Sequence, residues 1–459
     1  MGEYSGFIAD KAPRVIEAGF TPDIDTPNLW DWQRDCVAWA CRLGRAALLE
    51  DTGLGKTRQQ VMWAKQVARH TGRRVLILAP LAVGAQTVRE GHKIDVDGIA
   101  QSRTPDDVST PIVVTNYERA HLYNPADFVG VVLDESSILK SFMGKTKRML
   151  IEQFGSVPYR LSCTATPAPN DHLELGNQAE FLGVMSSHQM IARWFINDAK
   201  TFGDYRLKGH AVESYWDWVS SWARCVGVPS DLGPHYSDDG YVLPELRMHY
   251  QTVGVDISEN RGESLFRQAD LSATGLHKER RQTAGARADR VAELVASEEQ
   301  EPWCVWVETN YDADEVMRRI PGAVEVSGSM KPDEKAARLL AFSDGEIRVL
   351  VTKPKIAGFG MNWQHCARTV FNGPSYSYEA LYQALRRFWR FGQTRAVDAH
   401  LVMATTEQSV WATLEDKATS HEEMKRAMFA ASRRAQSRSA SPDAYFPTHS
   451  AHLPRWLNY

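Results

Sequence analysis

A strand–loop–helix unit at Ala46–Thr57 constrains the fold of this chain more than any other stretch. It begins with an apolar run that predicts a buried strand, and apolar residues return at helical spacing after the loop. Gly53 and Gly55 let the loop turn tightly and direct its backbone N–H groups to one point, where the new helix adds its N-terminal dipole. Lys56 supplies a full positive charge beside them. The unit is therefore typical of a cradle for the β- and γ-phosphates of a nucleoside triphosphate.

The strict form of this phosphate loop has a glycine where this chain has Glu50, so an ordinary glycine-rich turn is the alternative. Thr57 offers a hydroxyl to a magnesium ion. Upstream, Gln33 has a donor and an acceptor on one planar amide and can pair with the N6 and N7 edge of adenine; a plain surface glutamine is the alternative. The predicted nucleotide-binding residues in this part of the chain are Gln33, Asp51, Thr52, Gly53, Leu54, Gly55, Lys56 and Thr57.

Apolar runs alternate with helical stretches through the first part of the chain. Such alternation indicates a parallel sheet, with functional residues at the carboxyl ends of its strands. The strands are expected at Arg74–Pro80, Pro111–Glu118, Gly130–Glu135 and Tyr159–Pro167. Pro80, Thr115 and Tyr117 lie toward two of these ends, and we expect them to contact nucleic acid or to couple that contact to the nucleotide site. Simple turn chemistry is the alternative for them.

Two adjacent acids, Asp134 and Glu135, end the third of these strands. The first carboxylate can hold the magnesium ion of the nucleotide, and the second can orient or deprotonate the attacking water. A solvated acid pair is the alternative. Thr164 and Thr166 follow the next strand, where they can link the acid pair to a bound polymer or simply form a threonine-rich turn before Pro167.

Residues 176–283 fit no α/β repeat, and we interpret them as a helical insert with a linker. Four tryptophans crowd the insert, and we expect them to pack in a small helical core rather than to stack on bases. They are Trp194, Trp216, Trp218 and Trp222. The α/β pattern resumes near Ala284, with helices at 286–298, 311–319 and 332–343 and strands at Trp303–Val307, Ala323–Val326 and Ile347–Thr352.

The stretch Gln383–Gln393 is rich in arginine. Arg387 and Arg390 have the i, i+3 spacing that places two side chains on one helix face. Two guanidiniums presented together suit a γ-phosphate whose charge spreads in the transition state, whereas a solvated basic helix is the alternative. Gly358 and Gly360 lie upstream and would allow the backbone to approach a phosphate or a second lobe closely.

In order and spacing, these elements resemble the Swi/Snf-type ATPases of helicase superfamily two over about residues 28–410. The matching elements are Gln33, Asp51–Thr57, Asp134–Glu135, Thr164–Pro167, Gly358–Asn362 and Gln383–Gln393. That family also has an acid in place of the first loop glycine, a lysine like Lys140 and an asparagine like Asn170. One departure is Ser136–Ser137, where relatives often carry Ala-His.

The resemblance implies an α/β fold with two RecA-like parallel-sheet lobes and a helical insert between them. It also implies ATP and Mg²⁺ as cofactors, with Arg387 and Arg390 acting in cis from the second lobe. Asn362 and Gln383 take the family's coupling or nucleic-acid positions. The expected domains are a lead-in at 1–27, lobe one at 28–185, the insert and linker at 186–283, lobe two at 284–415 and a basic tail at 416–459.

Composition sets the expected partners and compartment. The net charge is −4, so any nucleic-acid contact must come from local basic patches. The 6 cysteines include no C-x-x-C pair, which argues against a zinc site and for a reducing compartment. No apolar run approaches membrane length and the first ten residues show no signal pattern, so we expect no membrane partner and a cytoplasmic or nucleoid-associated protein of a bacterial or phage-infected cell.

These patterns predict a nucleic-acid-stimulated ATPase that moves along duplex DNA. One alternative is a strand-separating DNA or RNA helicase of the same fold. The other, from a different class, is a non-enzymatic nucleic-acid-binding module with a degenerate ATP site. Five intact side chains argue against the module: Lys56, Asp134, Glu135, Arg387 and Arg390. A protein partner is not identifiable from the sequence.

Overall fold

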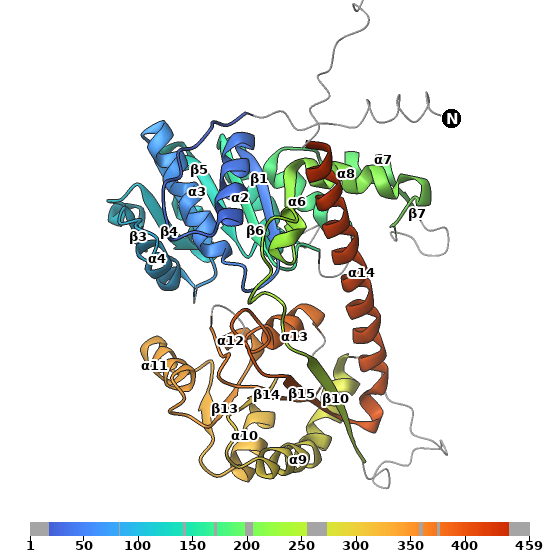
Figure 1. Ribbon diagram of the computed structural model, residues 1–459. Coiled ribbons are helices and arrows are strands. Elements are labelled where there is room, and N and C mark those ends of the chain that lie inside the picture. The colour runs from blue at the N-terminus through green and yellow to red at the C-terminus, as the bar shows by residue number, and fades with distance from the viewer. Residues whose placement is uncertain are drawn as a thin grey trace, which may run out of the picture.

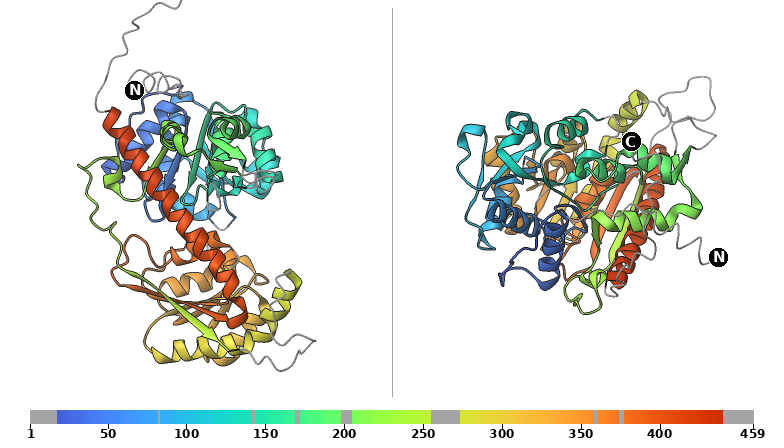
Figure 2. Two further views of the ribbon diagram at one scale, coloured as in Figure 1. Left: turned by 90° about the vertical axis from the view of Figure 1, so that its right-hand side faces the viewer. Right: turned by 90° about the horizontal axis from the view of Figure 1, so that it is seen from above.

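The computed structural model describes residues 18–81, 83–140, 144–168, 172–197, 205–254, 273–357, 361–373 and 377–439. They form two α/β lobes, each built on a parallel sheet, and a long helix, α14 (Gln408–Ser439), that runs alongside both lobes (Figure 1). The left view of Figure 2 shows the same course of α14 from the second lobe to the first. The predicted fold class, α/β with two RecA-like lobes, is confirmed.

The sheet of the first lobe has the strand order β3-β4-β2-β5-β6-β1-β9, and every neighbouring pair is parallel. Its strands are β1 (Arg45–Glu50), β2 (Arg74–Ala79), β3 (Ile99–Gln101), β4 (Ile112–Asn116), β5 (Phe128–Asp134), β6 (Tyr159–Thr164) and β9 (Ala223–Val226). The four strands predicted in this lobe are confirmed. Their apolar runs are buried on both faces, which parallel strands covered by helices require.

Helices cover both faces of this sheet, and strand β1 shows how one strand supports two cores. Ala46 and Leu48 pack in one core, whereas Ala47 and Leu49 pack in the other, because successive side chains of a strand point to opposite faces. Helix α2 (Asp31–Leu43) precedes β1. The later helices of this lobe are α3 (Lys56–Thr71), α4 (Gly84–His92), α5 (Lys145–Phe154) and α6 (Glu174–Leu182).

The predicted helical insert also carries strands, which corrects the expectation of a helical stretch. It contains α7 (Ser187–Trp194), β7 (Phe195–Asn197), β8 (Tyr205–Leu207) and α8 (Val212–Trp222). After α8, β9 returns to the first sheet beside β1, and β10 (Leu246–Val253) joins the edge of the second sheet. A strand as short as β9 leaves too few residues for its period to be recognised in the sequence.

The tryptophans of the insert pack in a core, as predicted. Trp194 stacks on Trp218 with ring centroids 4.8 Å apart, and Trp218 meets Trp222 edge to face at 5.4 Å. Trp216 is buried in the same cluster. Helix α14 closes this core with three buried side chains, Met424, Met428 and Ala431. The predicted basic tail is therefore helical as far as 439 and packs in this core as far as Ala431; residues 440–459 lie outside the described part of the chain.

The sheet of the second lobe has the strand order β10-β15-β14-β11-β13-β12, again with parallel pairs throughout. Its other strands are β11 (Trp303–Trp306), β12 (Val324–Val326), β13 (Val349–Thr352), β14 (Arg368–Asn372) and β15 (Val397–Ala404). Its helices are α9 (Ala273–Ser297), α10 (Asn310–Arg319), α11 (Pro332–Ser343), α12 (Pro354–Ala357) and α13 (Tyr378–Leu385). The helices and strands predicted between 286 and 352 are confirmed.

Short 3₁₀ helices connect several elements: η1 (Pro105–Asp107), η2 (Tyr117–Leu122), η3 (Pro125–Asp127), η4 (Ser136–Leu139), η5 (Gly209–Ala211), η6 (Pro229–Leu232) and η7 (Thr405–Glu407). All six cysteines are buried and none forms a disulfide. Across the described ranges, no helix combines the length and the apolar character needed to cross a bilayer.

The tryptophan core generates a stability prediction. Trp218→Ala should lower the free energy of unfolding by roughly 3–5 kcal/mol, because it removes a large buried side chain that stacks between two other tryptophans. Trp30→Ala is the control, since the Trp30 side chain is 59% exposed and its loss should change stability by no more than about 0.5 kcal/mol. Urea denaturation followed by circular dichroism measures both. Equal stability of the two variants would contradict the packing role.

Candidate active site

The loop between β1 and α3 lies against both lobes. Gly53 and Gly55 have φ values of +92° and +81°, a left-handed conformation that favours glycine. A side-chain carbon on Gly55 would lie 2.5 Å from Nε2 of Gln33, and one on Gly53 would lie 3.0 Å from the backbone nitrogen of Phe391 in lobe two. The two glycines therefore permit the close approach of the loop to helix α2 on one side and to the second lobe on the other.

Lys56 and Thr57 begin helix α3 directly after this loop. Nζ of Lys56 donates hydrogen bonds to the backbone carbonyls of Glu50 at 2.8 Å and Asp51 at 2.9 Å, so its charge lies across the loop. The first turn of a helix has backbone N–H groups without helical partners, and its dipole favours an anion. The loop, the lysine and the helix start together fit the phosphates of a nucleotide.

Gln33 is buried and its amide contacts the loop. Nε2 donates to the carbonyl of Leu54 at 2.8 Å, and Oε1 accepts from the backbone N–H of Trp30 at 3.1 Å. The side chain therefore fixes the phosphate loop to the start of α2, a contact that the sequence did not predict. Its pairing with adenine stays a prediction.

Asp134 ends β5 and Glu135 follows it, and β6 lies between β5 and β1, the strand that leads into the phosphate loop. Burial and the neighbouring Glu135 raise the pKa of Asp134 to about 7, while the charge of Lys56 opposes this shift. Burial also raises the pKa of Glu135, against the charges of Lys56 and Arg387. Glu135 has φ +55° and ψ +56°, a conformation that costs a non-glycine residue about 1–3 kcal/mol and often marks a functional site.

Two adjacent acids that burial penalises form a site that a cation would stabilise. Magnesium is commonly bound by one or two protein oxygens together with water and phosphate, so Asp134 with the hydroxyl of Thr57 fits it. Within the described ranges, no cluster of three or more His, Cys, Asp and Glu side chains is arranged to hold a metal ion. The donor set thus suits a nucleotide-bound Mg²⁺ better than an ion held by protein alone.

Polar contacts connect the acid pair to the second lobe. Thr164 donates to Oε2 of Glu135 at 3.4 Å, and Thr166 donates to Oε1 of Glu379 on α13 at 3.5 Å. Glu379 also pairs with Lys140 and accepts from Gln383 at 3.3 Å. Glu379 had no motif of its own in the sequence; its position one helical turn before Gln383 is the only signal for it.

Arg387 and Arg390 converge, although not on a helix face as predicted. Helix α13 ends at Leu385, and both arginines lie in the turns after it. The reason is a competing tertiary contact, because the carbonyl of Arg387 accepts from the backbone N–H of Trp363 at 3.0 Å. Both guanidiniums donate to the carbonyl of Met361, at 3.4 Å and 3.1 Å.

Burial sets the electrostatics of this arginine pair. It lowers the pKa of Arg387 to about 10, while Glu135 acts in the opposite direction. It lowers the pKa of Arg390 to about 9, and the neighbouring charges of Arg387 and Arg386 add to that shift. Both groups stay protonated at neutral pH, so the second lobe presents two desolvated cations to the cleft. Such a pair suits a multiply charged anion.

The remaining predicted residues have simpler surroundings. The Pro80 carbonyl accepts from Val83 N–H at 2.9 Å, and the Tyr117 hydroxyl donates to the Asp134 carbonyl at 2.6 Å. Thr115 is buried in β4, and its hydroxyl has no hydrogen-bond partner in the described part of the chain. Asn362 directly follows Met361. Three predicted residues lie outside the described part: Asn170, Gly358 and Gly360.

Three side chains that the sequence did not predict surround the carboxylate of Asp51. Tyr382 of α13 donates to Oδ1 at 2.6 Å, and Arg386 lies 3.1 Å from the same oxygen. Lys425 of α14 lies 2.9 Å from Oδ2. Arg386 also contacts the hydroxyl of Thr52 and donates to its carbonyl at 2.9 Å. Asp51 and Thr52, predicted to bind nucleotide, are therefore engaged by lobe two and α14.

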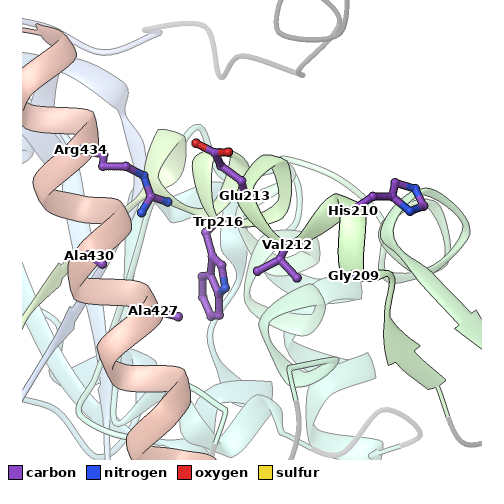
Figure 3. A pocket seen from close by; sticks show the side chains of 8 residues that line it. All are labelled: Gly209, His210, Val212, Glu213, Trp216, Ala427, Ala430 and Arg434. Carbon is purple, nitrogen blue, oxygen red and sulfur yellow. The ribbon is translucent and has the colours of Figure 1, made fainter. Parts of the chain in front are cut away.

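A separate cavity of about 400 Å³ lies between α8 and α14 (Figure 3). Trp216, Val212 and Glu213 line it from the insert side, and Ala427, Ala430 and Arg434 from α14. No predicted site residue lines it. The cavity is therefore distinct from the phosphate loop and plays no part in the nucleotide site.

Known proteins resemble the second lobe and most of the chain. Residues 286–392 match the helicase conserved C-terminal domain. The second lobe is helicase-like. Two curated relatives, the DNA annealing helicase and endonuclease ZRANB3 of Mus musculus and of Bos taurus, are each 22% identical over 451 residues, which cover 87% of this chain and 41% of the relative. The chain thus spans about two fifths of the length of these relatives.

A solved structure, the Sulfolobus solfataricus SWI2/SNF2 ATPase core in complex with dsDNA, matches at 17% identity with a TM-score of 0.40, covering 93% of this chain and 97% of that one. The predicted similarity to helicase-type ATPases is supported by the domain match and by the curated relatives.

The convergence of the two arginines generates a prediction. Arg387→Ala and Arg390→Ala should each leave ATP affinity nearly unchanged and lower the hydrolysis rate steeply, since arginines that act on the transition state contribute on the order of 10³–10⁵ in rate. Equilibrium binding of a fluorescent ATP analogue and a single-turnover assay separate the two effects. Arg395→Ala, which removes a half-exposed arginine paired with Glu301, is the control. Weak binding with normal hydrolysis at saturation would make these side chains ground-state contacts only.

Proposed function

We propose that this chain is an ATP-driven motor that moves along nucleic acid, with duplex DNA as its track. The observation that carries the proposal is the contact of the phosphate loop with Phe391 and the arginine turns of lobe two. A site assembled from two lobes can be completed by closure and dismantled by opening. If each lobe holds the track, alternation between these states moves one grip relative to the other.

The residues have distinct roles in this proposal. Lys56 would contact the β- and γ-phosphates, and Thr57 with Asp134 would hold Mg²⁺, which would neutralise charge on those phosphates. Glu135 orients the attacking water, for which its place at the end of β5 is suited. Arg387 and Arg390 stabilise charge that develops on the transferred group. Gln33 holds the loop and recognises adenine with the remaining capacity of its amide.

Coupling to the track follows the polar contacts between the lobes. The route runs from Glu135 to Thr164 in lobe one, and from Thr166 to Glu379 across the cleft. The other proposed coupling or nucleic-acid contacts are Pro80, Thr115, Tyr117, Asn362 and Gln383. Gly358 and Gly360 belong to the proposed nucleotide site.

One observation supports DNA as the polymer, and another supports translocation over strand separation. The similar curated proteins are named DNA annealing helicases, which supports DNA as the polymer. Unwinding requires an element that replaces base stacking at the fork, and the four tryptophans of the insert, which could stack on bases if exposed, are buried in its core. We further propose the boundaries 28–185 and 284–415 for the two lobes, to which β9 and β10 are added because they pair with the first and the second sheet. We propose a bacterial or phage-infected cell as the setting.

Glu135→Gln should trap an ATP-bound, closed state. The substitution removes the charge that orients water but keeps a similar shape, while Asp134 is unchanged. ATP-dependent binding to DNA should then outlast that of the wild type by about tenfold or more, as measured by dissociation of a labelled duplex. Asp127→Asn, at the exposed turn before β5, is the control for loss of one acid in the same part of the lobe. Rapid hydrolysis by Glu135→Gln would assign the water-orienting role to another residue.

The proposed function is tested by the ATPase rate without polymer and with single-stranded DNA, duplex DNA or RNA. Duplex DNA should stimulate hydrolysis most, and ATP should drive displacement of the third strand from a triplex while a forked duplex stays annealed. Binding should weaken strongly with salt, since it depends on phosphates. Lys56→Ala, folded but inactive, is the control.

Efficient, ATP-dependent separation of the fork would favour the strand-separating helicase. Absence of ATPase activity in the folded wild type under every condition would leave a binding module as the function.

A further inference from the structure

The carboxylate of Asp51 joins three parts of the molecule at one point. Asp51 belongs to the phosphate loop of lobe one, Tyr382 lies on α13 of lobe two and Arg386 directly after it, and Lys425 lies on α14. Lys425 also donates to the hydroxyl of Tyr382 at 3.1 Å, which closes the network. A single carboxylate therefore faces two cations and a hydroxyl, none of which comes from its own lobe.

These charges are removed from water. The side chain of Asp51 is 12% exposed, that of Lys425 11% and that of Arg386 4%. Burial alone would raise the pKa of Asp51, but Arg386 and Lys425 hold it below its ordinary range. Burial would lower the pKa of Lys425, but Asp51 raises it above its ordinary value. Asp51 and Lys425 are therefore both ionised, and opening the cleft would remove Arg386 from Asp51 and require these separated charges to be rehydrated.

The same loop residues present the catalytic lysine. The backbone carbonyl of Asp51 accepts from Lys56, and the next residue, Thr52, is held by Arg386 through its hydroxyl and its carbonyl. A side chain that fixes Asp51 thus also fixes the position of the loop relative to Lys56. Tyr382, Arg386 and Lys425 do not themselves contact the predicted reacting groups, Glu135 and Lys56, through any hydrogen bond recorded in the described part of the chain.

Helix α14 is anchored at this point. Met424 and Met428 flank Lys425 in the sequence and pack in the tryptophan core of the insert. Lys425 therefore stays beside Asp51 when the lobes separate, because its helix is fixed on lobe one's side of the molecule. Separation of lobe two must break the contacts of Asp51 with Tyr382 and Arg386, together with the hydrogen bond from Lys425 to the Tyr382 hydroxyl.

We infer that Asp51, Tyr382, Arg386 and Lys425 form a closure latch, a set of positioning residues that holds the two lobes together around the phosphate loop before nucleotide binds. The latch shifts the equilibrium toward the closed cleft, and a ligand that binds the closed form gains apparent affinity by the same factor. Lobe closure by the latch is independent of catalysis, whereas its effect on ATP affinity rests on the proposed function.

The latch is tested first by the distance between the lobes without nucleotide. All six native cysteines are buried, so Asp106→Cys in lobe one and Glu299→Cys in lobe two, both exposed, can be labelled selectively with a dye pair. Lys425→Met should reduce the high-transfer, closed population by about tenfold relative to the open one. Lys417→Met, which removes a lysine from the same helix, is the matched control and should leave the distribution unchanged.

Further variants distinguish a latch from loss of folding. Lys425→Arg keeps the cation and should retain most of the closed population. Asp51→Asn and Arg386→Met should each open the cleft, and the double variant should open it little further than Arg386→Met alone, because both changes break the same contact between the lobes. Circular dichroism and thermal melting identify any variant that is unfolded. Tyr382→Phe, which removes only one hydroxyl, is then measured in place of the unfolded variant as the milder probe.

The second readout is kinetic. Lys425→Met should raise the KM for ATP by about tenfold with a smaller change in kcat, since the latch changes closure rather than the reacting groups. A closed population in Lys425→Met equal to that of Lys417→Met, or full additivity of the double variant, overturns the latch. An opened cleft in Lys425→Met together with no ATPase activity in the wild type supports the latch and refutes the proposed function, so the two can fail separately.

Discussion

Buried acids and arginines meet in the cleft, where burial penalises the charge of each one alone. Asp134 and Glu135 lie on lobe one, and burial raises their pKa values, to about 7 for Asp134. Arg387 and Arg390 lie on lobe two, and burial lowers their pKa values. Glu135 and Arg387 provide counter-charge to each other when the lobes meet. The parallel sheets, which bring the ends of their strands to this cleft, are the frame that makes this partial neutralisation possible.

The two lobes could be predicted because their strands are continuous apolar runs that end at glycine, proline or polar residues, as in β2 and β5. Three features could not. Strand β9 is too short to show a period, and the end of α13 is decided by the contact of Arg387 with Trp363. Helix α14 reads as a basic tail because its buried methionines are separated by charged residues, and only the tryptophan core of the insert gives them a partner.

The residues of the candidate site likewise fall into those that the sequence predicts and those that it does not. Lys56, Asp134 and Arg390 belong to local motifs whose chemistry is visible in a few adjacent residues, and the structure brings them to one cleft. Glu379 and Lys425 have no such motif. Lys425 lies 374 residues after Asp51 in the sequence, and its role depends on a contact that only the folded chain creates. Gln33 was expected to face adenine alone, but its amide also holds the phosphate loop, since α2 begins beside that loop.

The strand order of the second sheet has a consequence for synthesis of the chain. Strand β10 is made before every other strand of its lobe, yet among the described residues its only neighbour in the sheet is β15, the last of these strands to be made. The first lobe, whose final strand is β9, can complete its sheet while the ribosome is still translating the second. During that interval β10 emerges as an unpaired edge with eight residues open to pairing with other chains. Ribosome-associated chaperones would therefore have to protect this strand from pairing with other chains until β15 has been made.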